Sequence, residues 1–173
     1  QQAGPFAGRS PKAIIAPHAG LMFSGAVAAQ LYARLIPVRE RIRRVVLMGP
    51  SHQVPFAGLA VSSAERFVTP LGAVPVDREG VAIARGQPQV RGLDAAHARE
   101  HSLEAQLPFL ERVLETFGIV PIVTGRTTPG ATGNLLEALW GGGGSLVVIS
   151  SDLSNFLGDR SARALDRHAA EAV

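Results

Sequence analysis

Short apolar runs rich in β-branched residues alternate with stretches of helical periodicity along most of this 173-residue chain. Continuous apolar runs of this length are typical of strands that helices cover on both faces. The runs are residues 13–16, 45–48, 59–61, 119–123 and 146–149, and the helical stretches are 24–36, 78–85, 102–117, 132–140 and residues from 159 onward. The alternation predicts an α/β fold, a three-layer sandwich with a mostly parallel sheet and antiparallel edge additions.

Local signals set several of the expected boundaries. Ser24 is expected to cap the first helix, and Asp77 is expected to cap the short helix that ends at Arg85. Pro121 predicts an edge strand or a bulge, because proline cannot donate a hydrogen bond to a neighbouring strand. Residues 67–76 read as a hairpin at an edge, residues 86–97 as a mobile connection, and Gly118 as the end of the helix over 102–117.

Size and composition are those of a globular protein with one domain over residues 1–173. Apolar residues form 46% of the chain and charged residues 18%, which excludes intrinsic disorder. The last predicted helix has no glycine, asparagine or proline to end it. We therefore expect that the chain is truncated at its C-terminal end.

Charge and apolar patterning also exclude several classes of partner. No apolar stretch approaches the roughly 20 residues of a membrane span, and the first residues lack the pattern of a secretory signal. The densest basic cluster, residues 39–44, contains Glu40 and no aromatic side chain for base stacking. The absence of cysteine excludes disulfides and thiolate ligands. The sequence predicts a cytoplasmic protein that binds neither nucleic acid nor membranes.

Polar residues follow three of the predicted strands at the point where each strand ends. They are Pro17-His18-Ala19-Gly20, Gly49-Pro50-Ser51-His52 and Ser150-Ser151-Asp152. Sites in open α/β sheets lie beyond the carboxyl ends of the strands, and neutral imidazole is the commonest metal ligand. One such histidine alone could simply hydrogen-bond a loop. Because the context occurs twice, His18 and His52 are predicted metal ligands.

Two further residues are candidates for the same crevice. His101 begins a predicted helix and can point toward the strand ends, although the carboxylates beside it, Glu100 and Glu104, are also what the helix dipole favours. Asp152 either caps the turn that follows it or orients a ligand histidine. The chain has no glycine-rich nucleotide loop and no nucleophile elbow.

Four ordered blocks of the chain resemble the Memo family, also called AmmeMemoRadiSam system protein B. The blocks are Pro17-His18-Ala19-Gly20 with Phe23-Ser24-Gly25, Gly49-Pro50-Ser51-His52, Glu100-His101-Ser102-Leu103-Glu104 with Gln106-Leu107-Pro108-Phe109-Leu110, and Ser150-Ser151-Asp152-Leu153-Ser154. The resemblance implies a fold related to class III extradiol dioxygenases and a non-haem-iron-like pocket. In that pocket His18 and His52 match metal ligands, and His101 and Asp152 match catalytic pocket residues. Iron is the implied metal, with copper or zinc as alternatives.

The chain departs from the family pattern in two places. The family's third ligand is a cysteine beyond the last block, and this chain has none, so either the natural chain continues past Val173 or the ligand is lost. Two histidines alone would hold a metal weakly. Asn155 stands where the family usually has a histidine, and an amide cannot transfer protons, which argues against ring cleavage.

Two functions of different classes follow from these observations. The first is a metal-dependent oxidoreductase of dioxygenase type acting on an unknown substrate. The second is a non-catalytic binding module or adaptor that uses the same crevice for a peptide or small ligand. The resemblance also implies an AMMECR-type domain and a radical SAM protein as partners.

Overall fold

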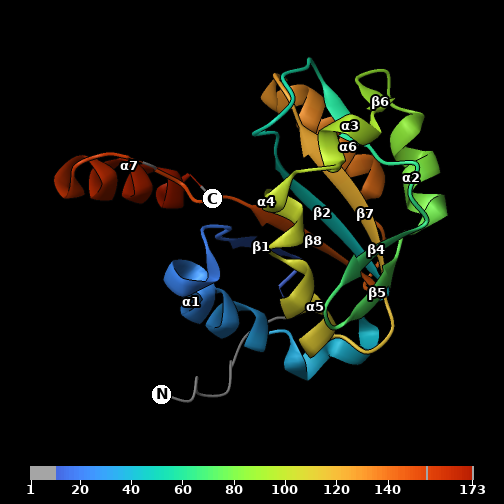
Figure 1. Ribbon diagram of the computed structural model, residues 1–173, viewed down its shortest axis with the longest axis horizontal. Helices are drawn as coiled ribbons and strands as arrows, with labels where there is room; N and C mark the ends of the chain where they lie inside the picture. Colours follow the sequence, from blue (N-terminus) through green and yellow to red (C-terminus); the bar gives the residue numbers. More distant parts are fainter. Residues whose placement is uncertain (1–10, 155, 173) are drawn as a thin grey trace.

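A six-stranded mixed sheet forms the centre of the computed structural model, which describes residues 11–154 and 156–172 (Figure 1). The strand order is β1-β8-β2-β7-β3-β6. β1, β8, β2 and β7 are parallel, whereas β3 is antiparallel to β7 and carries β6 parallel to itself at the edge. The strands are β1 (Ala13–Ala16), β2 (Arg44–Pro50), β3 (Leu59–Val61), β6 (Val90–Gly92), β7 (Gly118–Thr124) and β8 (Ser145–Ser150). The predicted α/β class and mostly parallel sheet are confirmed.

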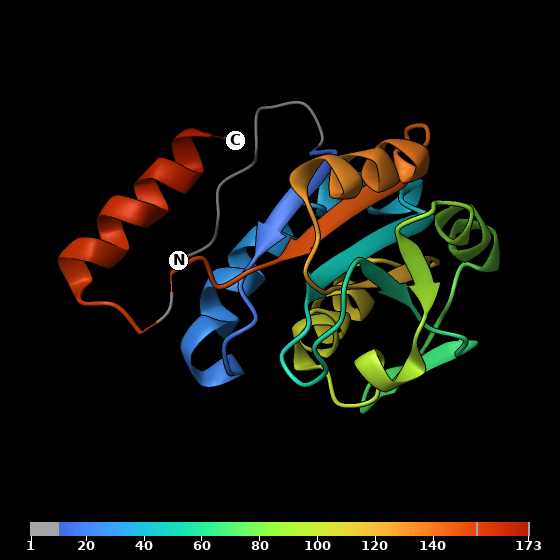
Figure 2. The same cartoon turned by 90° about the horizontal axis from the view of Figure 1, so that it is seen from above.

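Helices flank the sheet on both faces (Figure 2). They are α1 (Leu21–Ala33), the 3-10 helix η1 (Ile36–Arg41), α2 (Arg78–Arg85), α3 (Asp94–His97), α4 (His101–Glu104), α5 (Leu107–Val113), α6 (Pro129–Leu139) and α7 (Asp159–Glu171). Alternate residues of β2 pack in two separate clusters: Val45 and Leu47 with α1, α4 and α5, and Val46 and Met48 with α2 and α6. Burial on both faces explains why the β2 sequence is continuously apolar.

A small antiparallel hairpin of β4 (Arg66–Thr69) and β5 (Gly72–Pro75) forms a second sheet. It confirms the hairpin predicted for residues 67–76. The Asp77 side chain then caps α2 by accepting a hydrogen bond from the Gly80 backbone N–H at 2.9 Å, also as predicted. Residues 86–97 are not an irregular connection, because they contain β6 and α3.

The predicted cap of the first helix was wrong. α1 begins at Leu21 with Gly20 as its N-cap, and the Ser24 hydroxyl instead donates a hydrogen bond to the Ala19 carbonyl at 2.6 Å. The helix also ends earlier than expected, at Ala33, and η1 follows with Pro37 in its first turn. Proline is tolerated there because the first N–H groups of a helix have no intrahelical partner.

The single helix predicted over residues 102–117 is two shorter helices, α4 and α5. Pro108 lies in the first turn of α5 and lacks the N–H that a continuous helix would donate to the Glu104 carbonyl. The apolar spacing that suggested one helix is satisfied by both, since Leu103, Leu107 and Leu110 all enter the same core cluster. Gly118 begins β7 and does not terminate a helix.

Pro121 lies inside the sheet, so the prediction of an edge strand was wrong: β7 is paired on both sides. The Ile119 carbonyl accepts a hydrogen bond from the Asp77 N–H. This carbonyl therefore points to the side of β7 that faces away from β2. Pro121, two residues on, directs its nitrogen to the same side. In the part of the chain that the structure describes, β3 pairs with β7 only from Ile122 to Thr124, so Pro121 lies outside that ladder and β3 needs no N–H from it.

The helix predicted from Asp159 is confirmed as α7, which carries no buried residue and extends away from the sheet in Figure 1. Within residues 11–154 and 156–172, no helix is both long enough and apolar enough to cross a membrane.

Candidate metal centre

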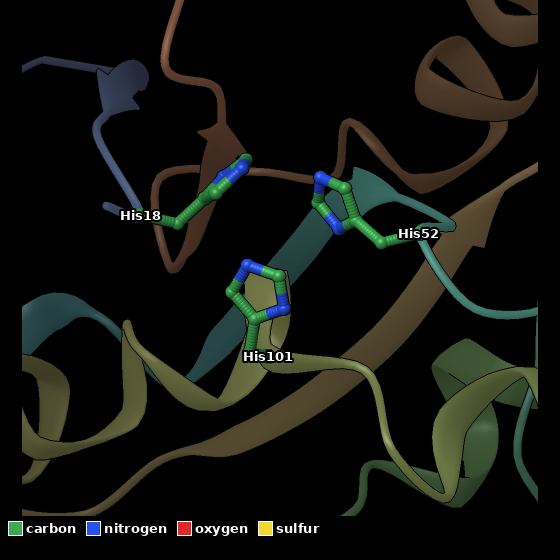
Figure 3. A group of neighbouring side chains, drawn as sticks. All are labelled: His18, His52 and His101. Atoms are coloured by element: carbon green, nitrogen blue, oxygen red, sulfur yellow. The ribbon is translucent and has the colours of Figure 1, made fainter. Parts of the chain in front are cut away.

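Three histidine rings meet at the carboxyl edge of the sheet (Figure 3). His18 follows β1, His52 follows β2 and His101 begins α4. One nitrogen from each ring lies within 4.8 Å of the others, and the ring centroids of His52 and His101 are 4.5 Å apart. Nitrogens that bind one ion at about 2.1 Å are at most about 4.2 Å apart. The three nitrogens are close to this spacing, so the group could hold a metal ion.

Parallel pairing explains why these residues meet. β8 lies between β1 and β2, with Ala16 opposite Ser150 and Met48 opposite Ile149. The carboxyl ends of the three strands therefore share one edge, and the residues after each strand enter the same space. His101 reaches this edge because α4 contacts the end of β2, where the Ser102 hydroxyl donates a hydrogen bond to the Pro50 carbonyl at 2.9 Å.

His18 is the buried member of the group, with only 4% of its surface exposed. Its Nδ1 lies 2.9 Å from Ser150 Oγ. Burial lowers the pKa of His18, although Asp152 opposes the shift, so at neutral pH the ring is uncharged and can act as a ligand.

Asp152 holds the loop that carries His18. Its Oδ1 accepts hydrogen bonds from the backbone N–H groups of His18 at 2.6 Å and of Ala19 at 2.8 Å. Its Oδ2 lies 3.7 Å from His18 Nε2. One carboxylate oxygen thus orients the loop that contains His18 and Ala19, and the other faces the histidine cluster. The catalytic role of Asp152 stays a prediction.

Glu100 is a buried carboxylate directly behind His52. Oε2 accepts the His52 backbone N–H at 2.6 Å, while Oε1 lies 2.7 Å from His52 Nδ1 and accepts the Ser102 N–H at 2.9 Å. Burial alone would raise the pKa of Glu100, but the donors on His52 and Ser102 outweigh it and lower the pKa to about 2. From the sequence, the helix dipole and a functional role explained Glu100 equally well, and this contact with His52 was not predicted.

The loss of folding stability in acid is expected to depend in part on the Glu100 carboxylate. Its folded pKa lies below the unfolded value of about 4.3, so its contribution to stability is complete above that value and is lost as pH falls toward 2. Urea unfolding measured between about pH 5 and pH 2.5 is expected to show a shallower loss of stability in Glu100→Gln than in the wild-type protein. Equal slopes would contradict the assignment.

A cavity of about 300 Å³ lies beside the rings. It is lined by His18 and His52, by Asp152 and by apolar side chains that include Met48, Ile149 and Leu153. A small molecule can therefore lie against His18, His52 and Asp152 at once.

The Memo-like protein family model matches residues 1–173. The chain belongs to the Memo family. It is 35% identical over 170 residues to a "MEMO1 family protein" of Methanobrevibacter smithii, covering 94% of this chain and 60% of that protein. It is 37% identical over 160 residues to the Aquifex aeolicus "MEMO1 family protein", which covers 90% of this chain and 58% of that protein. It is 35% identical over 177 residues to the Caenorhabditis elegans "Protein memo-1 homolog", which covers 96% of this chain and 48% of that protein. The chain thus spans about 60% or less of these Memo relatives.

Membership in the Memo family agrees with the resemblance of the four sequence blocks, while the fold relationship to extradiol dioxygenases stays a prediction. The two predicted ligands, His18 and His52, lie together, and His101 joins them as a third nitrogen donor. His101 was predicted as a catalytic pocket residue, and that role is untested. Asn155 lies outside the described residues.

Proposed function

We propose that this Memo-family chain binds a transition-metal ion through His18, His52 and His101 and uses it as a redox or dioxygenase-type centre for a small molecule. The observation that carries the proposal is the convergence of three imidazoles from separate elements at one sheet edge, two of them held by buried hydrogen-bond partners. Imidazole ligands suit iron, copper and zinc, and iron is our first choice. A bound iron or copper would supply redox chemistry and open coordination positions.

The two carboxylates of the site have different roles in this proposal. Glu100 has a pKa of about 2 and uses both oxygens on the His52 and Ser102 donors, so it stays ionised and holds His52 in place. Asp152 has Oδ2 directed to the cluster and borders the cavity. It is therefore the carboxylate that can accept a proton from a molecule beside the rings.

The remaining expectations about the protein belong to the same proposal. They are a cytoplasmic location and association with an AMMECR-type domain and a radical SAM protein. The non-catalytic alternative, a binding module for a peptide or small ligand, predicts that a chelator leaves ligand binding unchanged.

Metal analysis after incubation with Fe(II), Cu(II) or Zn(II) tests the proposal. We expect the wild-type protein to retain about one ion per chain after desalting and the His18→Ala/His52→Ala variant to retain none. His168→Ala is the matched control, because His168 is an exposed histidine on α7 and should leave the metal content unchanged. Equal retention by the double variant and the wild type would disprove the metal site.

A further inference from the structure

A buried network of three polar side chains lies behind His18. It consists of Tyr32 on α1, Gln106 at the N-cap of α5 and Ser150 at the end of β8, all between 0% and 2% exposed. The Tyr32 hydroxyl donates to Gln106 Oε1 at 2.9 Å. Gln106 Nε2 donates to the Pro17 carbonyl and to Ser150 Oγ, both at 2.9 Å. Of the three residues, only Ser150 also lines the cavity beside the rings.

The orientation of the Gln106 amide follows from its neighbours. The Pro17 carbonyl can only accept a hydrogen bond, so the amide must present its NH₂ group there. The opposite orientation would place two oxygens in contact at 2.9 Å. With the NH₂ fixed in this way, one of its hydrogens reaches Pro17 and the other reaches Ser150.

Hydrogen-bond accounting at Ser150 then fixes the proton on His18. A serine hydroxyl has one hydrogen and two lone pairs. The hydrogen goes to the Ser102 carbonyl, an acceptor at 2.6 Å, and one lone pair accepts from Gln106. Only a lone pair remains for His18 Nδ1 at 2.9 Å, so Nδ1 must carry the proton. His18 Nε2 is then unprotonated.

Asp152 is the group that could reverse this arrangement, because its carboxylate would favour a proton on His18 Nε2. The distances from the two ring nitrogens to their neighbours decide between the two tautomers. Asp152 Oδ2 is 3.7 Å from Nε2, beyond the range of a hydrogen bond, whereas Ser150 lies at 2.9 Å from Nδ1. Glu100 produces the same tautomer at His52, since its carboxylate at 2.7 Å can only accept from Nδ1.

We propose that Tyr32, Gln106 and Ser150 are positioning residues that fix His18 in the tautomer with the proton on Nδ1 and leave Nε2 as the ligand atom. The consequence for metal affinity rests on the proposed function, whereas the tautomer is a property of the metal-free protein. Partners that fix the tautomer and orientation of a ligand histidine typically change metal affinity by about 10- to 100-fold when they are removed.

Nitrogen NMR of the metal-free protein tests the proposal directly. With ¹⁵N-labelled histidine, long-range proton–nitrogen spectra distinguish a protonated ring nitrogen from a bare one. We expect His18 Nδ1 to be protonated in the wild type and the two tautomers to mix in Ser150→Ala and, to a smaller extent, in Tyr32→Phe. Ser62→Ala, which removes another buried serine hydroxyl bonded to Asp94, should leave the His18 signals unchanged. A protonated Nε2 in the wild type would overturn the proposal, as would unchanged His18 signals in both network variants.

Calorimetric titration with Zn(II) then separates this inference from the proposed function. We expect Ser150→Ala to bind Zn(II) about tenfold more weakly than the wild type, with Ser62→Ala unchanged. If the wild type binds no metal while its His18 shows the expected tautomer, the proposed function fails and the assignment of positioning residues to the ring stands. If the wild type binds metal and the network variants match it in both tautomer and affinity, the inference fails alone.

Discussion

Replacing Glu100 with alanine is expected to lower the free energy of unfolding by about 3–5 kcal/mol and to remove metal binding. The carboxylate accepts two backbone N–H groups, from His52 and Ser102, and it holds the His52 ring. Hydrogen bonds to a charged group each contribute about 1.5–3 kcal/mol, and alanine offers these donors no replacement. Urea denaturation and metal titration of the same variant measure the two effects.

Glu104→Ala provides the matched control for this prediction. Glu104 is an exposed carboxylate at the last residue of α4, the short helix that Glu100 caps. Its removal should change stability by less than about 0.5 kcal/mol, because exposed substitutions away from special features have small effects. A loss below about 1 kcal/mol in Glu100→Ala would show that the donors find other partners.

A methyl group at Gly49 is expected to destabilise the fold by about 2–3 kcal/mol and to weaken metal binding. A Cβ atom at this position would lie 2.6 Å from Ser102 Oγ and 3.0 Å from Leu103 Cδ2. Both side chains belong to α4, so α4 must move away from β2 to accept it. α4 begins with His101 and has Glu100, which holds His52, as its N-cap, so this movement is expected to shift His101 and His52 relative to His18. Thermal unfolding and Zn(II) titration of Gly49→Ala measure both effects.

Gly133→Ala is the same chemical change where space is open. Gly133 lies within α6, and apart from its chain neighbours and the backbone of its own helix no atom lies within 4 Å of the position of an added Cβ. Alanine there should stabilise the protein by about 0.5–1 kcal/mol, since glycine is a poor helix former. Gly49→Ala should lower the free energy of unfolding and Gly133→Ala should raise it. This difference distinguishes steric contact with α4 from a general effect of replacing glycine. A neutral Gly49→Ala would refute the contact.

The central strands and the two strand-end histidines could be predicted from the sequence because their signals are local. Continuous apolar runs identified β2 and β8, and the residues after the strands identified His18 and His52. The wrong predictions arose where one residue type has two structural meanings. Pro121 was taken to indicate an edge strand or a bulge, because the run itself does not show that β3 pairs only with residues 122–124 of β7. The helix over residues 102–117 was extended across Pro108, which begins a new helix.

The supporting residues of the site could not be predicted, because their roles depend on contacts between distant segments. Gln106 bonds Pro17 and Ser150 across 89 and 44 residues of sequence. Glu100 reaches His52 across 48 residues. A carboxylate at the start of a helix is common on dipole grounds alone, so Glu100 gave no distinguishing signal. Glu100 and Gln106 both belong to the sequence block around His101, and that shared block is the signal that could have identified them.

The place of β8 between β1 and β2 has a consequence for biosynthesis. β1 pairs with β8, whose residues come more than 130 positions later, so the first strand emerges from the ribosome long before its neighbour exists. At about 5–20 residues per second, His18 waits several seconds or more before Ser150 and Asp152 are translated. The sheet edge that brings the three histidines together can therefore form only after β8 has been synthesised, and a nascent chain stalled before residue 145 lacks it.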